Sequence, residues 1–465
     1  MTDTPANTGL YPTLWRWHFY AGLMVMPLIL ILSVTGALYL FKPQVERWEE
    51  RGFQNLPMDG AVSPNGQAEA AMAAFPGSRF HSYRLPERAG DAAMIHLSLA
   101  DGTAMRDVFV SPQGRVLGSL DPEWRIIAID HDIHGQLLLG PRGSWIVELA
   151  ASWAIVMILT GLYLWWPRGR NLAGVVWPRL SLGRRAFWRD IHAVTGFWVA
   201  GLALVLLVTG LPWADAWGSA FKLARQELGL LHGPQDWTIG GKPVAEEHAG
   251  HEGMDMGGGA MHAEHDHAAM MRMQSSGVAL PSLAEIVAKA QRERLAFPVV
   301  VVAPGAPGQF GGAGDAMAWT VRSDAQNRPL RVTLRYDMAT GKEVSRQGFG
   351  DKHVVDRIIG YGVAWHEGQL FGWVNQLVGL LTAIMLVTLV VSGFVMWRRR
   401  KPEGTLGAPL PARSPARMQG VVAITLLLAV LLPLFAASLI LLWFIDRLVL
   451  PRLPGVARWL GLRLT

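Results

Sequence analysis

The sequence predicts a membrane α-helical bundle of five spans with two small α+β domains outside the membrane, arranged as an internal two-fold repeat. Three observations lead to this class. Of the 465 residues 51% are hydrophobic and only 17% are charged, a mixture typical of a protein embedded in a bilayer. Five apolar stretches are long enough to cross the ~30 Å hydrocarbon layer as helices. Matching residues also recur at fixed offsets in the two halves of the chain.

The apolar stretches lie at roughly residues 19–41, 144–166, 191–213, 371–397 and 419–445. The first is too long for a secretory signal and ends in Phe41-Lys42-Pro43 without a small-residue cleavage site, so we expect a retained anchor. The expected order is the N-terminus and first span (1–43), an outer domain (44–143), the second span (144–167), a basic loop (168–190), the third span (191–213), a second outer domain (214–370), the fourth span (371–397), a basic loop (398–418), the fifth span (419–445) and a tail (446–465).

Basic residues in the two short loops set the expected orientation. They are Arg168, Arg170, Arg179, Arg184, Arg185 and Arg189 in the first loop and Arg398, Arg399, Arg400, Lys401, Arg413 and Arg417 in the second. Because such loops stay on the cytoplasmic side, the N-terminus is expected inside, and the two domains and the tail outside. The pI of 9.7 then reflects topology, and we expect no binding of nucleic acid.

The repeat consists of a histidine, a glycine and a later hydroxyl-glycine pair. The first and third spans share one set of offsets, with His18, Gly22 and Thr35-Gly36 in one and His192, Gly196 and Thr209-Gly210 in the other. The second and fourth spans share another, with His134, Gly140, Thr160-Gly161 and Trp165 in one and His366, Gly372, Ser392-Gly393 and Trp397 in the other. Agreement at so many offsets predicts one architecture for both halves.

The two outer segments resemble each other more loosely. Residues 66–120 combine an Ala-rich helical pattern with alternating runs at 94–99 and 106–110 and a turn at 111–114. Residues 281–346 combine a helix at 283–290 with runs at 318–321 and 331–336 and a turn at 340–341. Each segment is therefore expected to pack one helix on a small antiparallel sheet.

The repeat places four histidines in matched positions, which are His18 and His192 at the cytoplasmic span ends and His134 and His366 on the outer side. A lone histidine at a span end is more often an interfacial residue, and hydroxyl-glycine pairs often only let helices pack closely. Four matched histidines instead favour axial ligands, so each pair is expected to hold one non-covalent, bis-His b-type haem. The absence of Cys excludes covalent c-type haem and Cys-ligated iron–sulfur clusters.

Two further groups of side chains carry weaker expectations. His131 has no repeat partner and is a spare ligand or a hydrogen-bonding neighbour of His134. Residues 246–273 form a His/Met-rich insert that is either a metal site, with copper preferred by imidazole and thioether donors, or a polar loop without a core. Its candidate ligands are His248, His251, Met254, Met256, His262, His265 and His267.

The motifs Trp15-Arg16-x-His18, Arg189-Asp190-Ile191-His192 and His366-Glu367-Gly368, together with the outer helix-and-sheet segments, resemble the PepSY-associated transmembrane family over nearly residues 10 to 400. The resemblance implies a multi-pass bacterial inner-membrane protein with periplasmic PepSY-like domains. Some members are di-haem ferric-siderophore reductases, so His18, His134, His192 and His366 take the role of haem ligands by resemblance. The implied reaction is reduction of chelated ferric iron during iron acquisition.

Several readings stay open at this level. The expected partners are a ferric siderophore or another metal chelate, membrane lipid, and a cytoplasmic or quinol electron donor, because the chain has no nucleotide fingerprint of its own. Cupric ion is the alternative acceptor. A transporter would need polar residues near the middle of its spans, and a non-catalytic binding or regulatory module would leave the four histidines unexplained.

Overall fold

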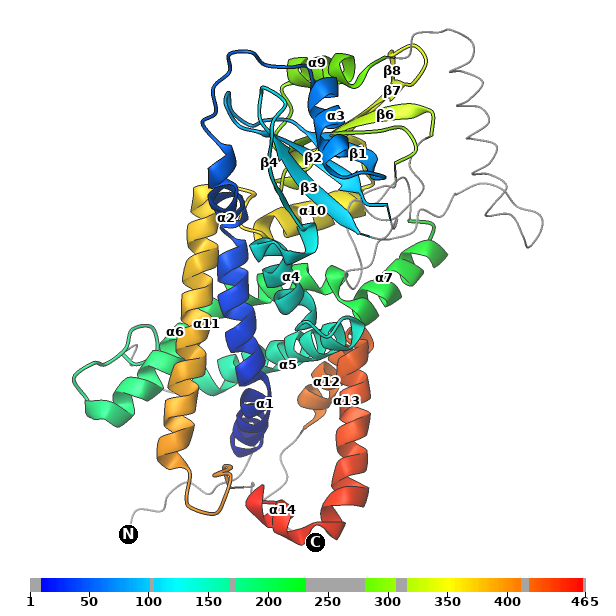
Figure 1. Ribbon diagram of the computed structural model, residues 1–465. Coiled ribbons are helices and arrows are strands. Elements are labelled where there is room, and N and C mark those ends of the chain that lie inside the picture. Colours follow the sequence, from blue (N-terminus) through cyan, green and yellow to red (C-terminus); the bar gives the residue numbers. More distant parts are fainter. Residues whose placement is uncertain are drawn as a thin grey trace, which may run out of the picture.

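A computed structural model describes residues 10–100, 104–167, 173–230, 281–306, 316–410 and 418–462. The molecule has a helical bundle and, beside one end of it, a β-sheet region (Figure 1). The bundle end nearest the sheet is called the sheet end here, and the opposite one the far end. The predicted ligands of the insert, His248, His251, Met254, Met256, His262, His265 and His267, lie outside the described residues.

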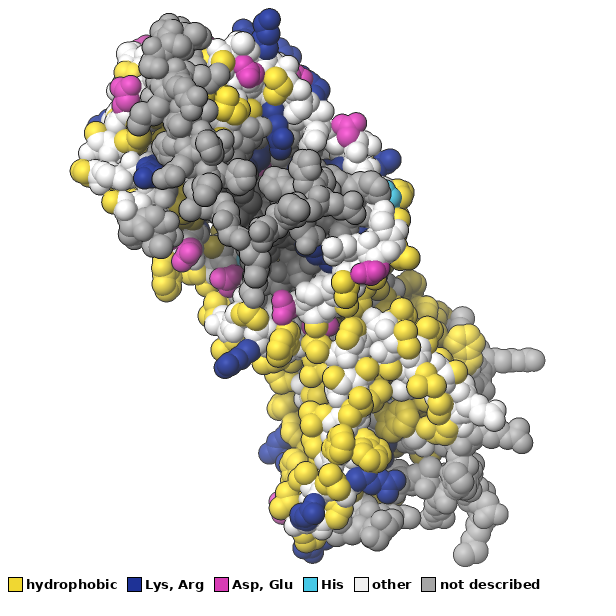
Figure 2. Space-filling view, turned by 90° about the vertical axis from the view of Figure 1, so that its right-hand side faces the viewer, with side chains coloured by type: hydrophobic (Ala, Val, Ile, Leu, Met, Phe, Trp, Pro, Cys, Tyr) yellow, Lys and Arg dark blue, Asp and Glu magenta, His cyan; other side chains and the backbone are white. Residues whose placement is uncertain are grey.

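Five helical segments in the described part of the chain are long and apolar enough to cross a membrane. Four agree with the predicted spans, and they are α1 (Leu10–Tyr39), α5 (Pro141–Trp165), α6 (Gly183–Gly210, extended by a 3₁₀ turn to Trp213) and α11 (Trp373–Arg400). α1 and α6 each pack against both α5 and α11, so the four helices enclose a common interior. Hydrophobic side chains gather over this bundle, whereas charged ones lie on the sheet region and at the far end of the bundle (Figure 2).

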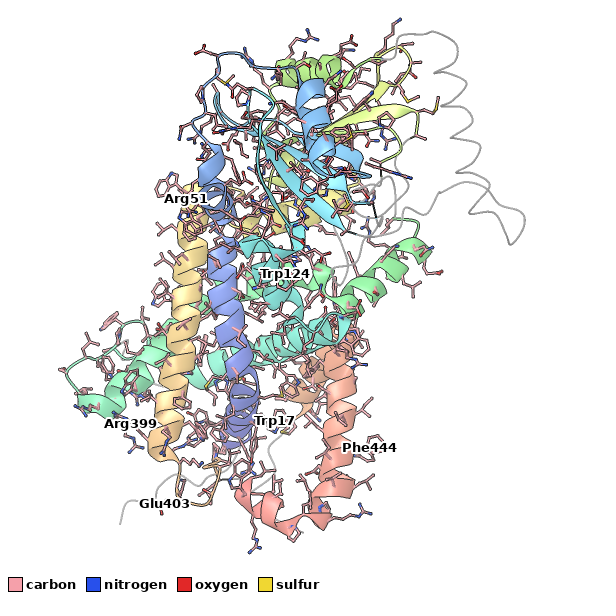
Figure 3. All side chains as sticks on the ribbon, viewed as in Figure 1. Trp17, Arg51, Trp124, Arg399, Glu403 and Phe444 are labelled. Atoms are coloured by element: carbon pink, nitrogen blue, oxygen red, sulfur yellow. The ribbon has the colours of Figure 1, made fainter. Side chains whose placement is uncertain are left out.

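Tryptophan and charged side chains mark the two ends of the bundle. Figure 3 places Trp17, Arg399 and Glu403 at the far end and Arg51 and Trp124 toward the sheet. Trp17 and Trp124 are exposed. Exposed tryptophans at both ends of an apolar bundle are typical of the two interfaces of a membrane.

The fifth predicted span, 419–445, is wrong as a single helix. The chain forms α12 (Gln419–Leu431), breaks at Leu432 and continues as α13 (Pro433–Phe444), with further helical turns to Arg452. Pro433 lacks an N–H and disfavours helical geometry in the residue before it, which explains the extended conformation of Leu432. At 13 residues α12 is about 20 Å long and too short to span a bilayer, so the candidate span is Pro433–Arg452.

This break places the described part of the C-terminal segment at the far end, whereas the prediction put tail 446–465 on the same side as the two domains. Trp217 follows α6 at the sheet end and donates a hydrogen bond to the carbonyl of Leu431. α13 then runs back, because Tyr20 and Arg16 near the start of α1 donate to the carbonyls of Leu460 and Gly461. Figure 1 shows α14 (Pro454–Trp459) and the start of α1 at the same end of the molecule.

The strands form one antiparallel sheet of eight in the order β4-β3-β2-β1-β5-β6-β7-β8. They are β1 (Arg79–Arg84), β2 (Ala93–Ser98), β3 (Met105–Val110), β4 (Val116–Leu120), β5 (Val299–Val302), β6 (Ala318–Ser323), β7 (Val332–Asp337) and β8 (Glu343–Gly348). The two expected sheets are therefore joined, because Ser82, Tyr83 and Arg84 of β1 pair with β5. This pairing covers an edge that each separate sheet would leave open.

Helices α3 (Pro64–Ala74) and α9 (Leu283–Glu293) cover one face of the sheet and bury its apolar core. Alternating residues of the central strands, such as Ile95, Val108, Val301 and Leu334, are fully buried there. The other face is turned toward α4 (Ile126–Gln136) and α10 (Val354–His366), which lie between the sheet and the bundle (Figure 1).

Ion pairs hold these two connecting helices. Arg125, just before α4, binds Glu49 at the end of α2 (Lys42–Glu49) and the next residue, Glu50. Arg225 of α7 (Asp215–Glu227) makes two hydrogen bonds to the carboxylate of Asp356 in α10, and both side chains are buried. Each connecting helix leads into the next span through a glycine, Gly140 or Gly372, with φ near +60° (60° and 58°), which only glycine adopts without strain.

Candidate functional site

The fold brings the four repeat histidines together as two pairs. His18 of α1 and His192 of α6 face each other toward the far end, with ring centroids 6.5 Å apart and ring planes at 85°. His134 at the end of α4 and His366 at the end of α10 face each other at the sheet end, with centroids 6.2 Å apart and planes at 79°. These are the two pairings that the sequence predicts.

Each imidazole is held by a hydroxyl from another helix. The Nδ1–hydroxyl distances are 3.0 Å for His18 and Thr160, 2.9 Å for His134 and Thr35, 3.1 Å for His192 and Ser392, and 3.1 Å for His366 and Thr209. The same hydroxyls donate their own hydrogens to the carbonyls four residues earlier, those of Val156, Ile31, Thr388 and Val205 respectively. The hydroxyl oxygen must therefore accept a hydrogen from Nδ1.

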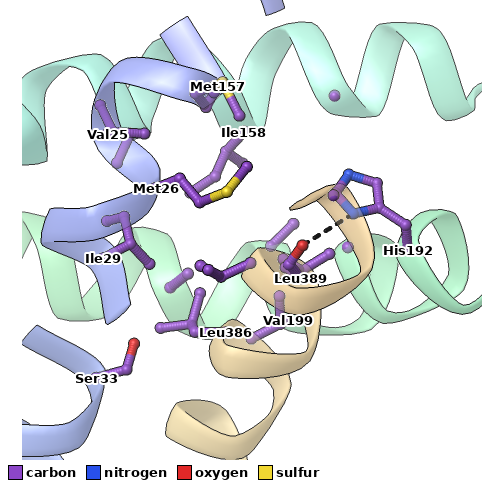
Figure 4. A pocket seen from close by; sticks show the side chains of 18 of the residues that line it. Val25, Met26, Ile29, Ser33, Met157, Ile158, His192, Val199, Leu386 and Leu389 are labelled. Carbon is purple, nitrogen blue, oxygen red and sulfur yellow. Dashed lines mark hydrogen bonds between the residues drawn. The ribbon is translucent and has the colours of Figure 1, made fainter. Parts of the chain in front are cut away.

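This arrangement sets the tautomer of the four rings. His192 shows it most directly, since its Nδ1 also lies 3.2 Å from the carbonyl oxygen of Leu389, which can only accept (Figure 4). With hydrogen on Nδ1, Nε2 keeps its lone pair, and no described residue hydrogen-bonds to Nε2 of these four histidines. An imidazole whose other nitrogen donates to a fixed acceptor is the usual form of a metal-ligating histidine.

Each hydroxyl is followed by a glycine that makes room for the same ring. A Cβ at Gly36, Gly161, Gly210 or Gly393 would lie 3.2, 3.2, 3.3 or 3.4 Å from Cε1 of the histidine held there. The absence of a side chain at these glycines therefore admits the edge of an imidazole. The hydroxyl-glycine pair of one helix is thus a socket for the histidine of another.

One continuous cavity of about 1380 Å³ contains all four histidines. Its middle is apolar, with Met26 and Ile29 of α1, Val199 of α6 and Leu386 of α11 directed into it (Figure 4). The volume exceeds the ~300–1,000 Å³ of a pocket for one drug-sized ligand. The imidazoles border this cavity, so part of their surface is accessible although they lie deep within the bundle.

The separations of the paired rings fit a metal between them. A metal–imidazole bond of about 2 Å puts each ring centroid about 3.2 Å from the metal, so two imidazoles on opposite faces of one iron have centroids about 6.3 Å apart. The observed 6.5 and 6.2 Å bracket this value. Two bis-His haems therefore fit the donor atoms, the spacing and the apolar cavity.

Electrostatics at the sheet end also favour ligation. Burial, with the neighbouring imidazole of His366, lowers the pKa of His134 to about 3. Burial lowers the pKa of His366 as well. A lowered pKa keeps both rings neutral at pH 7, which is the state that binds a metal.

His131 lines the cavity but does not join either pair. Its ring lies 6.0 Å from that of Tyr39, and its Nδ1 lies 3.5 Å from a carboxylate oxygen of Asp132. One turn of α4 separates it from His134, so the two project from the same side of one helix and cannot bind opposite faces of a haem. It is a neighbour of the sheet-end pair.

The two ends of the cavity differ in charge. The far end is lined by Arg184, Arg185, Arg399 and Arg400, which suit the carboxylates of a porphyrin. At the sheet end the lining includes the buried Glu148, whose carboxylate accepts from two backbone N–H groups of α7, and Glu367, which is paired with Arg328.

Replacing Thr209 by Val should leave the fold intact but weaken haem binding by about 10- to 100-fold, because removal of a fixed acceptor frees the ring of His366 to rotate or change tautomer. Titration of the haem-depleted protein with haem measures this. Thr388→Val is the matched control, since the side chain of Thr388 in α11 bonds only within its own helix. If both variants and the unchanged chain bound haem with equal affinity, the hydroxyl of Thr209 would not hold His366 for haem binding.

Comparison with known proteins gives one family. The model of the PepSY-associated TM region matches residues 15–400, which is most of the chain and includes all four repeat histidines. No curated protein matches the sequence.

Proposed function

We propose that this chain, which belongs to the PepSY-associated transmembrane family, is a di-haem protein. In this proposal it passes electrons across a membrane to a metal chelate. The proposal rests mainly on the two facing pairs of histidines, one at each end of a single apolar cavity. Haem iron, when bound, supplies a one-electron carrier at each end. The residues of the chain fix the ligand tautomers, set the spacing and exclude water.

The orientation belongs to the same proposal. Arg184, Arg185, Arg399 and Arg400 lie at the far end, together with Arg452 and Arg458 of the C-terminal segment, and by the positive-inside rule they support a cytoplasmic position for that end. The sheet then lies in the periplasm of a bacterium, and the protein is in the inner membrane. Equivalent sockets in both halves support a two-fold repeat of helix, outer segment and helix.

The proposed acceptor is a ferric siderophore. Transfer of one electron converts Fe(III) to Fe(II), and hard oxygen ligands hold the less charged ion more weakly, so the iron is released from its chelate. The electron comes from a cytoplasmic or quinol donor, because the chain carries no nucleotide fingerprint. The family resemblance supports iron as the metal.

Cupric ion is the second candidate, and the His/Met-rich stretch 246–273 favours it. Histidine and methionine together are donors for copper, whereas a ferric siderophore brings its own oxygen ligands. The two candidates differ in whether this stretch is needed.

Reoxidation of the dithionite-reduced protein distinguishes them. Stopped-flow absorbance follows the haem bands after addition of a ferric siderophore or cupric ion, with and without residues 246–273. An iron-chelate reductase should keep its rate after the deletion, because neither histidine pair involves that stretch. A copper reductase should lose affinity for its substrate. If neither acceptor reoxidised the intact protein, the reductase proposal would be wrong.

A further inference from the structure

The repeat continues beyond the hydroxyl-glycine pairs at the sheet end. Tyr39 stands three residues after Gly36, and Trp213 stands three residues after Gly210. Both side chains line the cavity. Each follows its glycine as the chain runs from the far end toward the sheet, so both lie on the outer side of their sockets. The two halves therefore each place an aromatic hydrogen-bond donor beside the sheet-end histidines.

The indole N–H of Trp213 is a buried donor for which the described part of the chain supplies no acceptor. Burying an N–H group without an acceptor costs free energy, and native structures rarely leave one in that state. Trp213 is close to His366, since it packs against the cluster of Ile359 and Val363, which lie about two turns and one turn before that histidine in α10. The acceptor is therefore expected to come from a molecule bound in the cavity.

Two tryptophans at the far end differ in this respect. Trp165 and Trp397 hold matched positions in the second and fourth spans, and they line the same cavity. Their N–H groups donate to the carbonyl oxygens of Val175 and Leu406, each at 2.9 Å. Of these three tryptophans, Trp213 is the one left to donate to a bound molecule.

We propose that Trp213 and Tyr39 donate hydrogen bonds to the propionate groups of the sheet-end haem, an assignment that rests on the proposed di-haem function. The propionates are the hydrogen-bonding groups on the rim of a b-type haem, and at pH 7 they are carboxylates. Hydrogen bonds to a carboxylate are about twice as strong as those to a neutral acceptor. Because both donors lie on the outer side of the sockets, the propionate edge points toward the sheet and the apolar edge toward the apolar middle of the cavity.

Cations beside both donors favour an anionic acceptor. Nζ of Lys42 lies 5.8 Å from the ring centroid of Tyr39, and the guanidinium carbon of Arg328 lies 6.0 Å from that of Trp213. Each cation already has a carboxylate partner. Neither is therefore fully available to a propionate, and the neutral donors should carry a measurable share of the binding.

The test compares haem with haem dimethyl ester, in which both propionates are esterified and uncharged. The full chain carries His18→Ala and His192→Ala, which empty the far-end site, so that titration measures the sheet-end site alone. Haem should bind more tightly than the ester by at least about 100-fold. Adding Trp213→Phe or Tyr39→Phe should each reduce this ratio by about 10-fold, because phenylalanine keeps an aromatic ring and removes one donor.

Trp217→Phe is the matched control. Trp217 lies at the same end, but its N–H donates to the carbonyl oxygen of Leu431, and it is not among the residues that line the cavity. This variant should keep the ratio of the chain with only the two alanine substitutions. The ratio also separates binding from folding, since a purely structural role of Trp213 would weaken haem and ester equally.

The outcomes distinguish this assignment from the haem proposal. If the unchanged chain took up no haem, the di-haem function would be wrong and this assignment with it. If haem bound but the ratio were the same with and without the indole N–H, the di-haem function would stand. The acceptor of Trp213 would then be another group, such as water shared with the buried Oε2 of Glu367, and the assignment would be overturned.

Discussion

Replacing His366 by Ala should lower the haem content from about two per chain to about one and abolish reduction of an external ferric chelate. The reason is that His366 is one of two imidazoles at the sheet end, and His134 alone cannot hold both faces of an iron. The socket at Thr209-Gly210 would be left empty. A pyridine haemochrome assay on purified protein measures the haem, and the reoxidation kinetics measure the reduction.

The control for this experiment is His131→Gln. His131 lies on the same helix as His134 and borders the same cavity, but it contacts Tyr39 and Asp132 rather than a socket. This variant should keep both haems. Retention of two haems and full activity by the His366→Ala variant would show that the sheet-end ligands have been assigned wrongly.

Replacing Gly161 by Val should remove the far-end haem while leaving the sheet-end one in place. A Cβ at Gly161 would lie 3.2 Å from Cε1 of His18, and the two methyl groups of valine would extend further into the space of the ring. His18 would then turn out of its socket and lose its bond to Thr160. Haem content should fall by about half, as measured by the same assay.

Gly201→Val is the matched control because Gly201 also lies within a span, in α6, and a Cβ there would meet nothing within 4 Å. It introduces the same side chain and the same change in helix propensity. Equal haem content in the two valine variants would mean that the glycine next to Thr160 does not serve the histidine.

Most of the membrane part of the fold could be predicted from the sequence because spans depend on local composition. Runs of apolar residues predict the ends of four spans to within a few residues of the observed helix ends. The exceptions are the starts of α1 and α6, where the helix begins about two turns before the predicted span. The fifth was wrong because Pro433 sits inside an unbroken apolar run and hydropathy does not register a break. The joining of the two sheets could not be foreseen either, since the pairing of β1 with β5 links segments on opposite sides of two spans.

The candidate site also has a part that the sequence predicts and a part that only the structure shows. The four histidines were found from their offsets, because a repeat is visible in sequence, and the structure brings them together in the predicted pairs. The hydroxyl-glycine pairs are visible in the same repeat, but the sequence pattern predicts only close helix packing for them and not their bonds to the histidines. Thr160 and His18 are far apart in the chain, and only the antiparallel packing of α1 and α5 shows that one holds the other.

The pairing of β1 with β5 also affects how the protein can be made. When the ribosome has finished the first four strands, β1 still has one edge without a partner, and its partner β5 follows only after α5 and α6 have entered the membrane. An unpaired edge strand is a template for aggregation. During synthesis the first four strands therefore form a sheet with one edge of β1 unpaired. A chain that stops after α5 would expose that edge permanently.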